Sequence, residues 1–516
     1  MLDSRPFPDI RLNTNLILGM DENPKYIVDK NSFNFLNQAM ESEPIKLWNN
    51  NELPKLWLYN LHYFNDLKSV DSKERQELLQ SLILSWIDQN PPGHGVGWES
   101  YPLSIRIVNL VKWHSAQDVV NKKVISSLVL QIRYLESNIE YHLKGNHLFS
   151  NAKALVFAGY FFEGPEASKW LKKGMKILCL EVKEQILKDG GHYERSPMYH
   201  ALALEDMLDL ENLIISKPDV FKHYEEHVGL WPKIIDKMVF WLNAMTHPDG
   251  NISFFNDAAF GIAASTNELN SYAERLGHIT NEGLNDLIYL EESGYIRINK
   301  GPITLLIDVA PVGPDYIPAH AHADSLSYEF SLNQQRIVVN SGTSHYYQGS
   351  GRDFERGTSA HSTVEVDSQN STEVWHSFRV ARRAKVCEVL IDEDSHRVII
   401  SAKHDGYLRL KKKCMHKRTW IIDAVSLEIT DDIQGGFSSA VSRHYLHPAI
   451  QRSNQKINDK KVILDNLSIE SRSHDVYEVP THWFPEFGLS IPNTCIEMSM
   501  HSNSSAPKFQ LKFLIT

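Results

Sequence analysis

The spacing of hydrophobic residues divides the chain into a helical part and a β part. Between about residues 71 and 290, apolar residues recur at intervals of three and four, for example in residues 73–89, 123–143 and 168–187. This spacing predicts amphipathic helices. From residue 291 onward the pattern changes to short alternating runs separated by turn residues, which predicts strands. We therefore expect an α+β protein in which helices precede strands.

The connections between these segments predict the architecture of each part. The helical segments follow one another in pairs joined by polar or aromatic loops, which favours an (α/α) toroid or solenoid. The strands of the second part favour antiparallel sheets layered as a sandwich. Several prolines interrupt the beginning of the chain, which we interpret as a lead-in. The predicted domains are the lead-in 1–70, the (α/α) toroid 71–290 and the antiparallel β-sandwich 291–516.

Composition and charge narrow the range of partners. The chain has 516 residues, of which 42% are hydrophobic and 23% charged, as in ordinary globular proteins. Its 53 Lys and Arg face 64 Asp and Glu, so the formal net charge is −11. A nucleic-acid binder would carry a basic surface, so we expect no nucleic-acid partner. An acidic ligand remains compatible, because a local basic cleft can operate within an acidic protein.

Cysteine spacing and hydropathy indicate the compartment. The four cysteines show no metal-binding spacing and read as buried thiols rather than a disulfide framework; they are Cys179, Cys387, Cys414 and Cys495. No apolar run approaches the roughly 18 residues of a membrane span. The N-terminal residues lack the basic and apolar regions of a signal peptide. We therefore expect a cytoplasmic protein, or a periplasmic or secreted one if the N-terminus has been trimmed.

The densest group of polar residues with chemical potential lies at residues 318–367. His320, His322 and Asp324 fall on the same side of the segment if it is extended, because side chains two apart in a strand share a face. His361 follows later. Burying such a group without partners costs several kcal/mol, so a functional cluster is favoured over isolated polar residues. Two neutral imidazoles two residues apart, with a third further on, are compatible with a zinc site.

Other polar clusters fall between predicted helices. Asn146 and His147 lie in one such loop, although an isolated loop asparagine more often caps a helix or forms a turn. Residues 190–200 are dense in Glu, Arg, Tyr and His, and Pro197 within them is also typical of a helix start. A third cluster, residues 247–257, contains an Asp-Gly pair that chiefly signals a turn.

Taken together, these segments resemble one known family. The matching pieces occur in the same order as in the family and span roughly residues 95–490. They are WESYPLSIRIVN, GNHLFSNAKAL, DGGHYERSPMYH, HPDGNISFFNDA, HAHADSLSYEF, NSGTSHYYQG, RGTSAHSTVEVD and WFPEFG. The chain is similar to the heparinase II/III family of polysaccharide lyases, and also resembles oligo-alginate lyases. The resemblance implies an (α/α) toroid followed by an antiparallel β-sandwich, in agreement with the hydrophobic spacing.

The resemblance also implies β-elimination at a uronic acid. Such an enzyme neutralises the uronate carboxylate, removes the proton from C5 and protonates the leaving oxygen on C4, so that an unsaturated end results. Asn146, aided by His147, corresponds to the group that binds the carboxylate. Tyr199 corresponds to the catalytic acid; a further role as base would require a cation such as Arg195 to lower its pKa. His320 corresponds to a base or to a group that orients the sugar.

The family pattern implies further site residues. Its metal ligands correspond to His322, Asn340 and His361, and the metal would be a structural zinc. Asn340 departs from the pattern, because the family usually has an aspartate there and a neutral amide binds zinc more weakly. Candidate substrate-binding residues are Arg106, Glu194, Arg195, Tyr346 and Arg443. The alternative for the charged members of this set is a structural salt bridge.

Two other functions remain open from the sequence. The segment His320–Asp324 nearly matches the metal motif of metallo-β-lactamase hydrolases, but Ser325 replaces a histidine of that motif and the chain lacks alternating helices and strands. A glycan-binding or polysaccharide-biosynthesis protein without turnover is the second alternative. For a lyase, Asn146, Tyr199 and His320 should converge in one cleft between the domains. The acidic composition favours a weakly sulfated or unsulfated uronate polymer as substrate, and the sequence assigns no oligomeric state.

Overall fold

The chain forms two compact units. The computed structural model describes residues 5–11, 16, 25–116, 121–280, 283–450, 452–464 and 467–515. The helical unit comprises Met1–Ile186, Leu202–Val239 and Asn267–Thr280, and the sheet unit comprises Leu187–Ala201, Phe240–Thr266 and Asn281–Thr516. Two stretches from the helical range of the sequence thus belong to the sheet unit, and the first of them carries Glu194, Arg195 and Tyr199.

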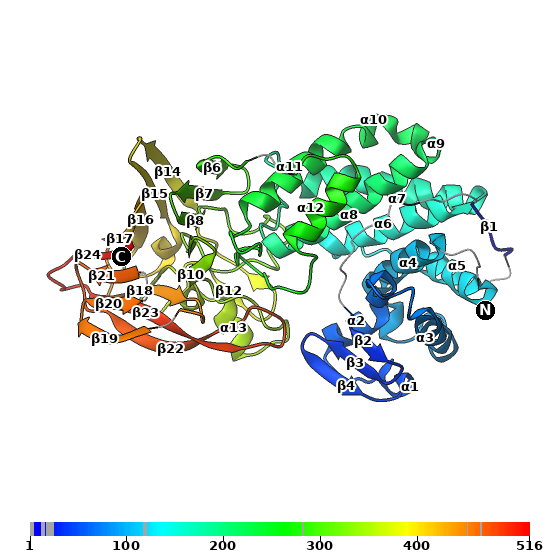
Figure 1. The fold of residues 1–516 in the computed structure, drawn as a ribbon, viewed down its shortest axis with the longest axis horizontal. Coiled ribbons are helices and arrows are strands. Elements are labelled where there is room, and N and C mark those ends of the chain that lie inside the picture. Colours follow the sequence, from blue (N-terminus) through cyan, green and yellow to red (C-terminus); the bar gives the residue numbers. More distant parts are fainter. Residues whose placement is uncertain are drawn as a thin grey trace. The chain divides into compact units, whose positions relative to one another are not determined.

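Helices dominate the first unit, in the blue to green part of Figure 1. Its small strands are β1 (Asp9–Ile10), which pairs with β5 (Phe162–Glu163), and β2 (Ile27–Asp29), β3 (Ser32–Phe35) and β4 (Gln38–Glu41), which form a three-stranded sheet. The helices that lie wholly or partly in this unit are α1 (Pro44–Leu47), α2 (Lys55–Tyr63), η1 (Asn65–Lys68), α3 (Gln76–Gln89), η2 (Val96–Trp98), α4 (Ser100–Ser115), α5 (Lys122–Ser137), α6 (Gly145–Phe161), α7 (Pro165–Gln185), α8 (Pro197–Ser216), α9 (Pro218–Phe221), η3 (Lys222–Tyr224), α10 (Glu225–Val228), α11 (Trp231–Ala244) and α12 (Thr266–Arg275).

Helix α6 is buried at the centre of this unit. Nearly all of its residues from Leu148 to Phe161 are shielded from solvent, as expected for a helix that is apolar on all sides. It packs against α4 and α7. The contact with α7 is close, because a Cβ atom added at Gly159 would lie 2.5 Å from Leu171 Cβ, and one added at Gly174 would lie 2.7 Å from the Ala152 carbonyl oxygen.

A buried ionic network joins four helices of the helical unit. Asp209 of α8 lies 2.5 Å from Lys112 Nζ of α4 and 2.5 Å from Lys153 Nζ of α6. The Tyr272 hydroxyl of α12 donates to the same carboxylate over 3.0 Å. Burial raises the pKa of Asp209, but the two lysines more than offset this and hold it below its ordinary value. Asp209 is therefore ionised, and the two lysines stabilise its charge.

The sheet unit consists mainly of two antiparallel sheets. Neighbouring strands of the first sheet follow the order β22-β23-β18-β10-β9-β8-β7-β6, with β11 also paired to β18. The bounds are β6 (Leu287–Leu290), β7 (Tyr295–Lys300), β8 (Ile303–Asp308), β9 (Tyr328–Leu332), β10 (Gln335–Val339), β11 (Val364–Val366), β18 (Ser439–Leu446), β22 (Tyr477–Trp483) and β23 (Ile491–His501).

The second sheet has the order β14-β15-β16-β17-β24-β21-β20-β19. Its strands are β14 (Val386–Glu393), β15 (Arg397–His404), β16 (Cys414–Asp423), β17 (Ser426–Gly435), β19 (Arg452–Asn458), β20 (Lys461–Leu464), β21 (Leu467–Ser471) and β24 (Lys508–Ile515). The helix α13 (Ser350–Arg356) and the short turn η4 (Thr358–Ala360) connect β10 to β11. The hairpin of β12 (Val374–Trp375) and β13 (Arg379–Val380) precedes β14, and the short turn η5 (Gly406–Arg409) connects β15 to β16.

The two sheets share one hydrophobic core. Phe330 of β9 and Phe513 of β24 meet with ring centroids 5.6 Å apart, and Trp420 of β16 is fully buried in the same core. Residues of β16 alternate between buried and partly exposed positions, as expected for a sheet with one covered face. Strands β8 and β9 are buried throughout, so the first sheet is covered on both faces.

The second covered face of the first sheet packs against a segment from the helical range. Trp241 and Phe255 form a hydrophobic cluster with Ile288 of β6, Tyr295 of β7 and Leu306 of β8. This packing explains why Phe240–Thr266 belongs to the sheet unit although its sequence falls among predicted helices. Among the residues that the structure describes, no helix is both long enough and apolar enough to span a membrane.

The ionic network at Asp209 leads to a stability prediction. Replacing Asp209 by Asn removes the counter-charge that partly buried Lys112 shares with buried Lys153, although Asp206 still pairs with Lys153; we expect this to cost about 3 kcal/mol. The midpoint of urea unfolding, followed by far-ultraviolet circular dichroism, should fall clearly. The control is Asp88→Asn, which removes the exposed Asp88–Lys123 pair and should cost less than about 1 kcal/mol. Equal effects of the two substitutions would contradict the assigned role.

Candidate functional site

Three aromatic side chains of the sheet unit meet at the candidate site. Tyr199 lies in the first turn of α8, where the Ser196 hydroxyl accepts a hydrogen bond from its backbone N–H over 3.1 Å. The Tyr199 ring stacks on His320 with centroids 4.0 Å apart and an interplanar angle of 13°. Its hydroxyl lies 2.9 Å from the hydroxyl of Tyr346. The structure thus brings together three predicted site residues that are far apart in the sequence.

Glu194 orients the imidazole of His320. The Glu194 carboxylate is buried and accepts a hydrogen bond from His320 Nδ1. Burial raises the pKa of Glu194, but His320 more than offsets this and holds it below its ordinary value. An ionised carboxylate accepts only, so the proton of this bond belongs to Nδ1, and Nε2 is the nitrogen left to exchange a proton with a substrate. This arrangement suits His320 to accept a proton.

The environment of Tyr199 favours the opposite role. Burial, followed by the nearby Tyr346 and Asp257, raises the pKa of Tyr199 well above its ordinary value. Arg195 does not counter this rise, because its guanidinium donates to the backbone carbonyls of Tyr193 and Ser293 over 2.9 and 3.2 Å. The base role, which required a lowered pKa, is therefore not supported. A phenol that stays protonated is suited to donate a proton.

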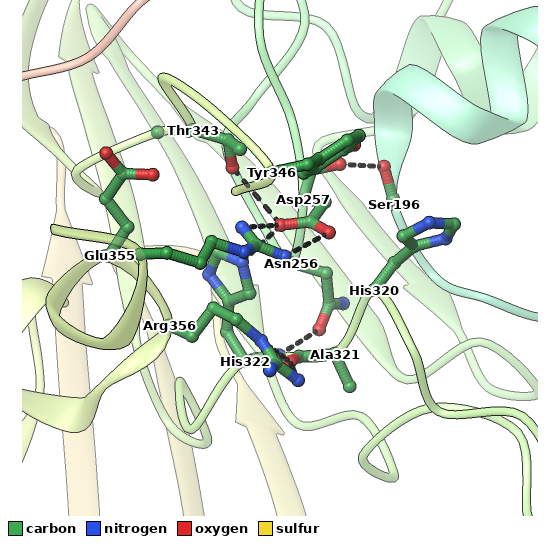
Figure 2. Close-up of polar contacts among 12 residues, drawn as sticks. Ser196, Asn256, Asp257, His320, Ala321, His322, Thr343, Tyr346, Glu355 and Arg356 are labelled. Atoms are coloured by element: carbon green, nitrogen blue, oxygen red, sulfur yellow. Dashed lines mark hydrogen bonds and ion pairs between the residues drawn. The ribbon is translucent and has the colours of Figure 1, made fainter. Parts of the chain in front are cut away.

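A buried carboxylate, Asp257, organises the loops behind these residues. Its oxygens accept from His322 Nε2 over 2.8 Å and from Arg352 Nη2 over 2.7 Å. They also accept from the Thr343 hydroxyl over 3.4 Å (Figure 2). Its backbone N–H donates to the His320 carbonyl over 3.0 Å. Burial raises the pKa of Asp257, but Arg352 and His322 more than offset this and hold it far below its ordinary value.

Helix α13 supplies two buried arginines that brace the same loops. Arg352 pairs with Asp257 and also donates from Nε to the Ser377 carbonyl over 3.2 Å. Arg356, one turn later, donates to the Ala321 carbonyl over 3.0 Å and to the His376 carbonyl over 3.0 Å. Both side chains are fully buried. Each arginine therefore links the loop that carries His320 to the hairpin β12–β13.

The predicted zinc ligands are close to one another but unequal. His322 Nδ1 and His361 Nε2 lie 3.1 Å apart. The other ring nitrogens bind Asp257 and the Gly357 carbonyl, over 2.8 and 2.7 Å, as outer partners do for metal-bound histidines. Burial lowers the pKa of both rings, so two neutral imidazoles turn lone pairs toward each other, and this pair fits a cation.

The third predicted zinc ligand, Asn340, is a neutral amide whose side chain already makes hydrogen bonds. The side-chain amide of Asn340 donates to the Phe254 carbonyl over 2.9 Å, and its oxygen accepts from the Ser362 N–H over 3.1 Å. Within the described part of the chain, no group of three or more His, Cys, Asp or Glu side chains could hold a metal ion. Two imidazoles and one neutral oxygen therefore make up the available set, and zinc at this position stays a prediction.

Two predicted substrate-binding arginines have structural partners instead. Arg443 of β18 lies between Glu365 and Glu497, at 3.0 and 2.8 Å, and these carboxylates occupy its guanidinium. Arg106 of α4 is fully buried in the helical unit, where it donates to the carbonyls of His62 and Gly97 over 3.0 and 2.7 Å. The structural alternative from the sequence therefore describes these two residues better than substrate binding.

Asn146 and His147 belong to the helical unit and lie in the first turn of α6 rather than in a loop. His147 stacks on Tyr101 with centroids 4.4 Å apart, and its Nδ1 lies 3.2 Å from a Glu140 oxygen. The first turn of a helix presents N–H groups and a positive dipole end, which favour a carboxylate ligand. The convergence of Asn146 with Tyr199 and His320 stays a prediction.

The sequence analysis missed the groups that brace the site. Asp257, Arg352 and Arg356 make the supporting contacts; Asp257 and Arg356 lie within the matching motifs but were given no role, and Arg352 lies outside them. One usable signal was present, because arginines four residues apart share a face of a helix. Glu194 was predicted to bind substrate, but its carboxylate is used to orient His320.

The loop that carries Tyr346 is tied to a carboxyl group with a shifted pKa. The oxygens of buried Glu355 accept from the backbone N–H and the hydroxyl of Ser344. Burial raises the pKa of Glu355 from 4.5 to about 7, although Ser344 and Arg352 oppose the rise. Asp257 acts in the same direction as burial, and His345 Nδ1 lies 3.6 Å from the carboxyl group.

This shift predicts a pH dependence of stability. Because the folded-state pKa is raised, the contribution of protonated Glu355 is fully present below pH 4.5 and is lost as the pH rises through about 7. The change should be on the order of 3 kcal/mol. In Glu355→Gln, the decrease of the thermal midpoint with rising pH should be smaller than in the wild type. Glu393→Gln, at an exposed position on β14, should show the same pH dependence as the wild type. An unchanged pH profile in Glu355→Gln would contradict this assignment.

Comparison with curated proteins finds similarity to three heparin-sulfate lyases and to one protein named for its localisation. It is 23% identical over 339 residues to a heparin-sulfate lyase of Bacteroides stercoris, covering 61% of this chain and 48% of the relative. It is 24% identical over 330 residues to the FtsZ-localized protein C of Caulobacter vibrioides, covering 61% of this chain and 52% of the relative. The chain spans about half the length of the curated relatives it matches.

Solved structures show the fold. Heparinase III superposes with a TM-score of 0.70 at 18% identity, covering 91% of this chain and 78% of the other. The heparan sulfate lyase HepC of Pedobacter heparinus gives a TM-score of 0.61 at 15% identity, covering 94% and 81%. This likeness confirms the predicted fold class, an (α/α) toroid followed by an antiparallel β-sandwich.

Two family models account for most of the sequence. The model described as "Heparinase II/III N-terminus" matches residues 40–278, and the model described as "Heparinase II/III-like, C-terminal" matches residues 282–512. The predicted resemblance is thereby confirmed. The chain belongs to the heparinase II/III family.

Proposed function

We propose that this chain is a polysaccharide lyase that cleaves a uronic-acid-containing glycan by β-elimination. The observation that carries the proposal is the cluster of Glu194, His320, Tyr199 and Tyr346, in which a histidine with Nε2 left to exchange a proton stacks on a protonated tyrosine. A base and an acid side by side are what elimination across one bond of a sugar ring requires. The similarity to heparin-sulfate lyases supports the same reaction.

The reaction can be written in terms of these residues. His320 Nε2 accepts the proton of C5, and the electrons of that C–H bond form the double bond between C5 and C4. The C4–O bond breaks, and its oxygen receives the Tyr199 proton, which the Tyr346 hydroxyl can replace through the bond between the two. Asn146, at the start of α6, is proposed to bind the uronate carboxylate and reduce the cost of charge at C5.

The proposed substrate is a weakly sulfated or unsulfated uronate polymer. Sulfate groups are best held by free guanidinium groups, yet Arg195, Arg352 and Arg356 at this site donate to backbone carbonyls or to Asp257. The net charge of −11 points the same way. The curated lyase relatives are named for heparin sulfate, and heparosan-like or alginate-like chains fit the arginine pattern better.

The proposal predicts separate losses in two variants. Tyr199→Phe removes the donated proton and His320→Ala removes the base, so each should lower kcat at least about 100-fold. The assay is the ultraviolet absorbance of the unsaturated product on a panel of uronate polysaccharides. The control is Tyr347→Phe, an exposed tyrosine next to Tyr346, which should stay within about twofold of wild type. Full activity in either site variant would contradict the assigned roles.

The second candidate function is glycan binding without turnover, associated with polysaccharide biosynthesis. It is favoured by the similarity to a relative whose name states a location with FtsZ rather than a reaction. Measurable oligosaccharide binding by the wild-type protein, together with no unsaturated product on any polymer, would favour this candidate.

The proposed zinc would have a structural role. Held by His322, His361 and Asn340, it would satisfy the two facing lone pairs and brace the loop that carries His320, and no reaction step passes through it. Because a carboxylate is anionic and an amide is not, Asn340→Asp should bind zinc at least about tenfold more tightly than the parent protein. Titration calorimetry with zinc checks this; equal affinity, or no heat in either protein, would contradict the proposed ligand set.

A further inference from the structure

The hairpin β12–β13 places an exposed aromatic ring beside the proposed catalytic residues. Phe378 follows the hairpin tip, and 41% of its surface is accessible. Its ring meets His320 edge to face with centroids 6.0 Å apart, and meets Tyr346 with centroids 5.4 Å apart. Because burial of a phenylalanine ring is favourable, this exposed ring offers apolar surface to a ligand that covers it.

Two buried arginine side chains hold the backbone next to this ring. The carbonyl of Ser377, immediately before Phe378, accepts from Arg352 Nε and Nη2, both over 3.2 Å. The carbonyl of His376 accepts from Arg356 Nη1 over 3.0 Å. His376 adopts a left-handed backbone conformation, with φ of 50°, which a non-glycine residue holds only when its surroundings favour it.

The same two arginines also hold the loop that carries His320. Arg352 pairs with Asp257, which binds His322, and Arg356 donates to the Ala321 carbonyl. The hairpin tip and the His320 loop are thus anchored to adjacent turns of α13 by buried guanidinium groups with planar, directional donors. These bonds restrain the backbone next to Phe378 relative to the His320 loop, so the ring is preorganised for a ligand.

An exposed, rigid phenyl ring next to a base and an acid has a specific use in sugar chemistry. The C–H groups of a pyranose ring form an apolar face, and aromatic faces bind such surfaces at a low entropic cost. The ring carries no charge, so it attracts neither the uronate carboxylate nor a sulfate. Its contribution is to bind and orient a sugar, not to transfer a proton.

We propose that Phe378 is a substrate-binding residue that stacks on the apolar face of a sugar ring next to the cleaved bond, with Arg352 and Arg356 as the residues that position it. The inference rests on the proposed function, because it assigns the occupant of the same site. It adds a contact made by a hairpin to a site otherwise built from α8 and the loops around His320 and Tyr346.

The test compares substitutions at two equally exposed aromatics of the same hairpin. Phe378→Ala should raise KM about fivefold to tenfold and leave kcat within about twofold, because stacking binds substrate without taking part in the chemistry. Phe378→Tyr should restore the wild-type KM, since the aromatic face is retained. The control is Trp375→Ala, at a position 42% exposed on β12, which should change KM by less than about twofold. Thermal midpoints of all variants confirm folding.

The outcomes separate this inference from the proposed function. Wild-type turnover with an unchanged KM in Phe378→Ala would overturn the inference alone, as would equal losses in Trp375→Ala and Phe378→Ala. Affinity electrophoresis in gels that contain the unsulfated polymer reads binding without turnover. Retardation that Phe378→Ala loses, with no unsaturated product from the wild type, would support the inference and overturn the lyase proposal. Neither retardation nor product from the wild type on any polymer would overturn both.

Discussion

The candidate site depends on the buried carboxylate of Asp257. A carboxylate without solvent is costly unless it is paired and hydrogen-bonded, and here Arg352, His322 and Thr343 supply the partners. These partners come from α13, from the loop around His320 and from the segment before Tyr346. Arg352 and His322 keep the carboxylate ionised, so one charge holds three segments together. Loss of that charge would leave a buried guanidinium without its counter-ion, which is among the largest single penalties in a protein interior.

The surroundings of His320 and Tyr199 hold protons on these two side chains in different ways. Glu194 fixes the proton of His320 on one nitrogen and leaves the other to exchange a proton with a substrate, whereas burial beside Tyr346 and Asp257 keeps Tyr199 protonated. A base and an acid whose environments push their protonation apart, and whose rings are stacked, can act on neighbouring atoms of one sugar. The hairpin extends this polar pair with an apolar ring, since Arg352 and Arg356 hold both the histidine loop and the backbone before Phe378.

Much of the fold could be predicted from the sequence, because hydrophobic spacing records which face of each helix or strand is buried. The division into helices and strands and the family itself follow from it and from short motifs. The sequence did not predict which segments belong to which unit. Phe240–Thr266 packs on the first sheet through Trp241 and Phe255, and no local sequence pattern predicts this contact. Within the site, motifs identified His320, Tyr199 and Tyr346. They also suggested Arg106 and Arg443, whose guanidinium groups have structural partners. Asp257 lies within a motif but was given no role, and Arg352 lies outside the motifs, because a buried ion pair between residues 95 positions apart is visible only after folding.

Cleavage by elimination can be distinguished from hydrolysis with water labelled with heavy oxygen. The wild-type protein would be mixed with an unsulfated uronate oligosaccharide in the labelled water, and both products would be weighed by mass spectrometry. Elimination consumes no water, so the account predicts that neither product acquires the label during cleavage and that one product is lighter than the hydrolysis product by one water molecule. Incorporation of heavy oxygen at the newly formed chain end during cleavage would show hydrolysis and would contradict the account.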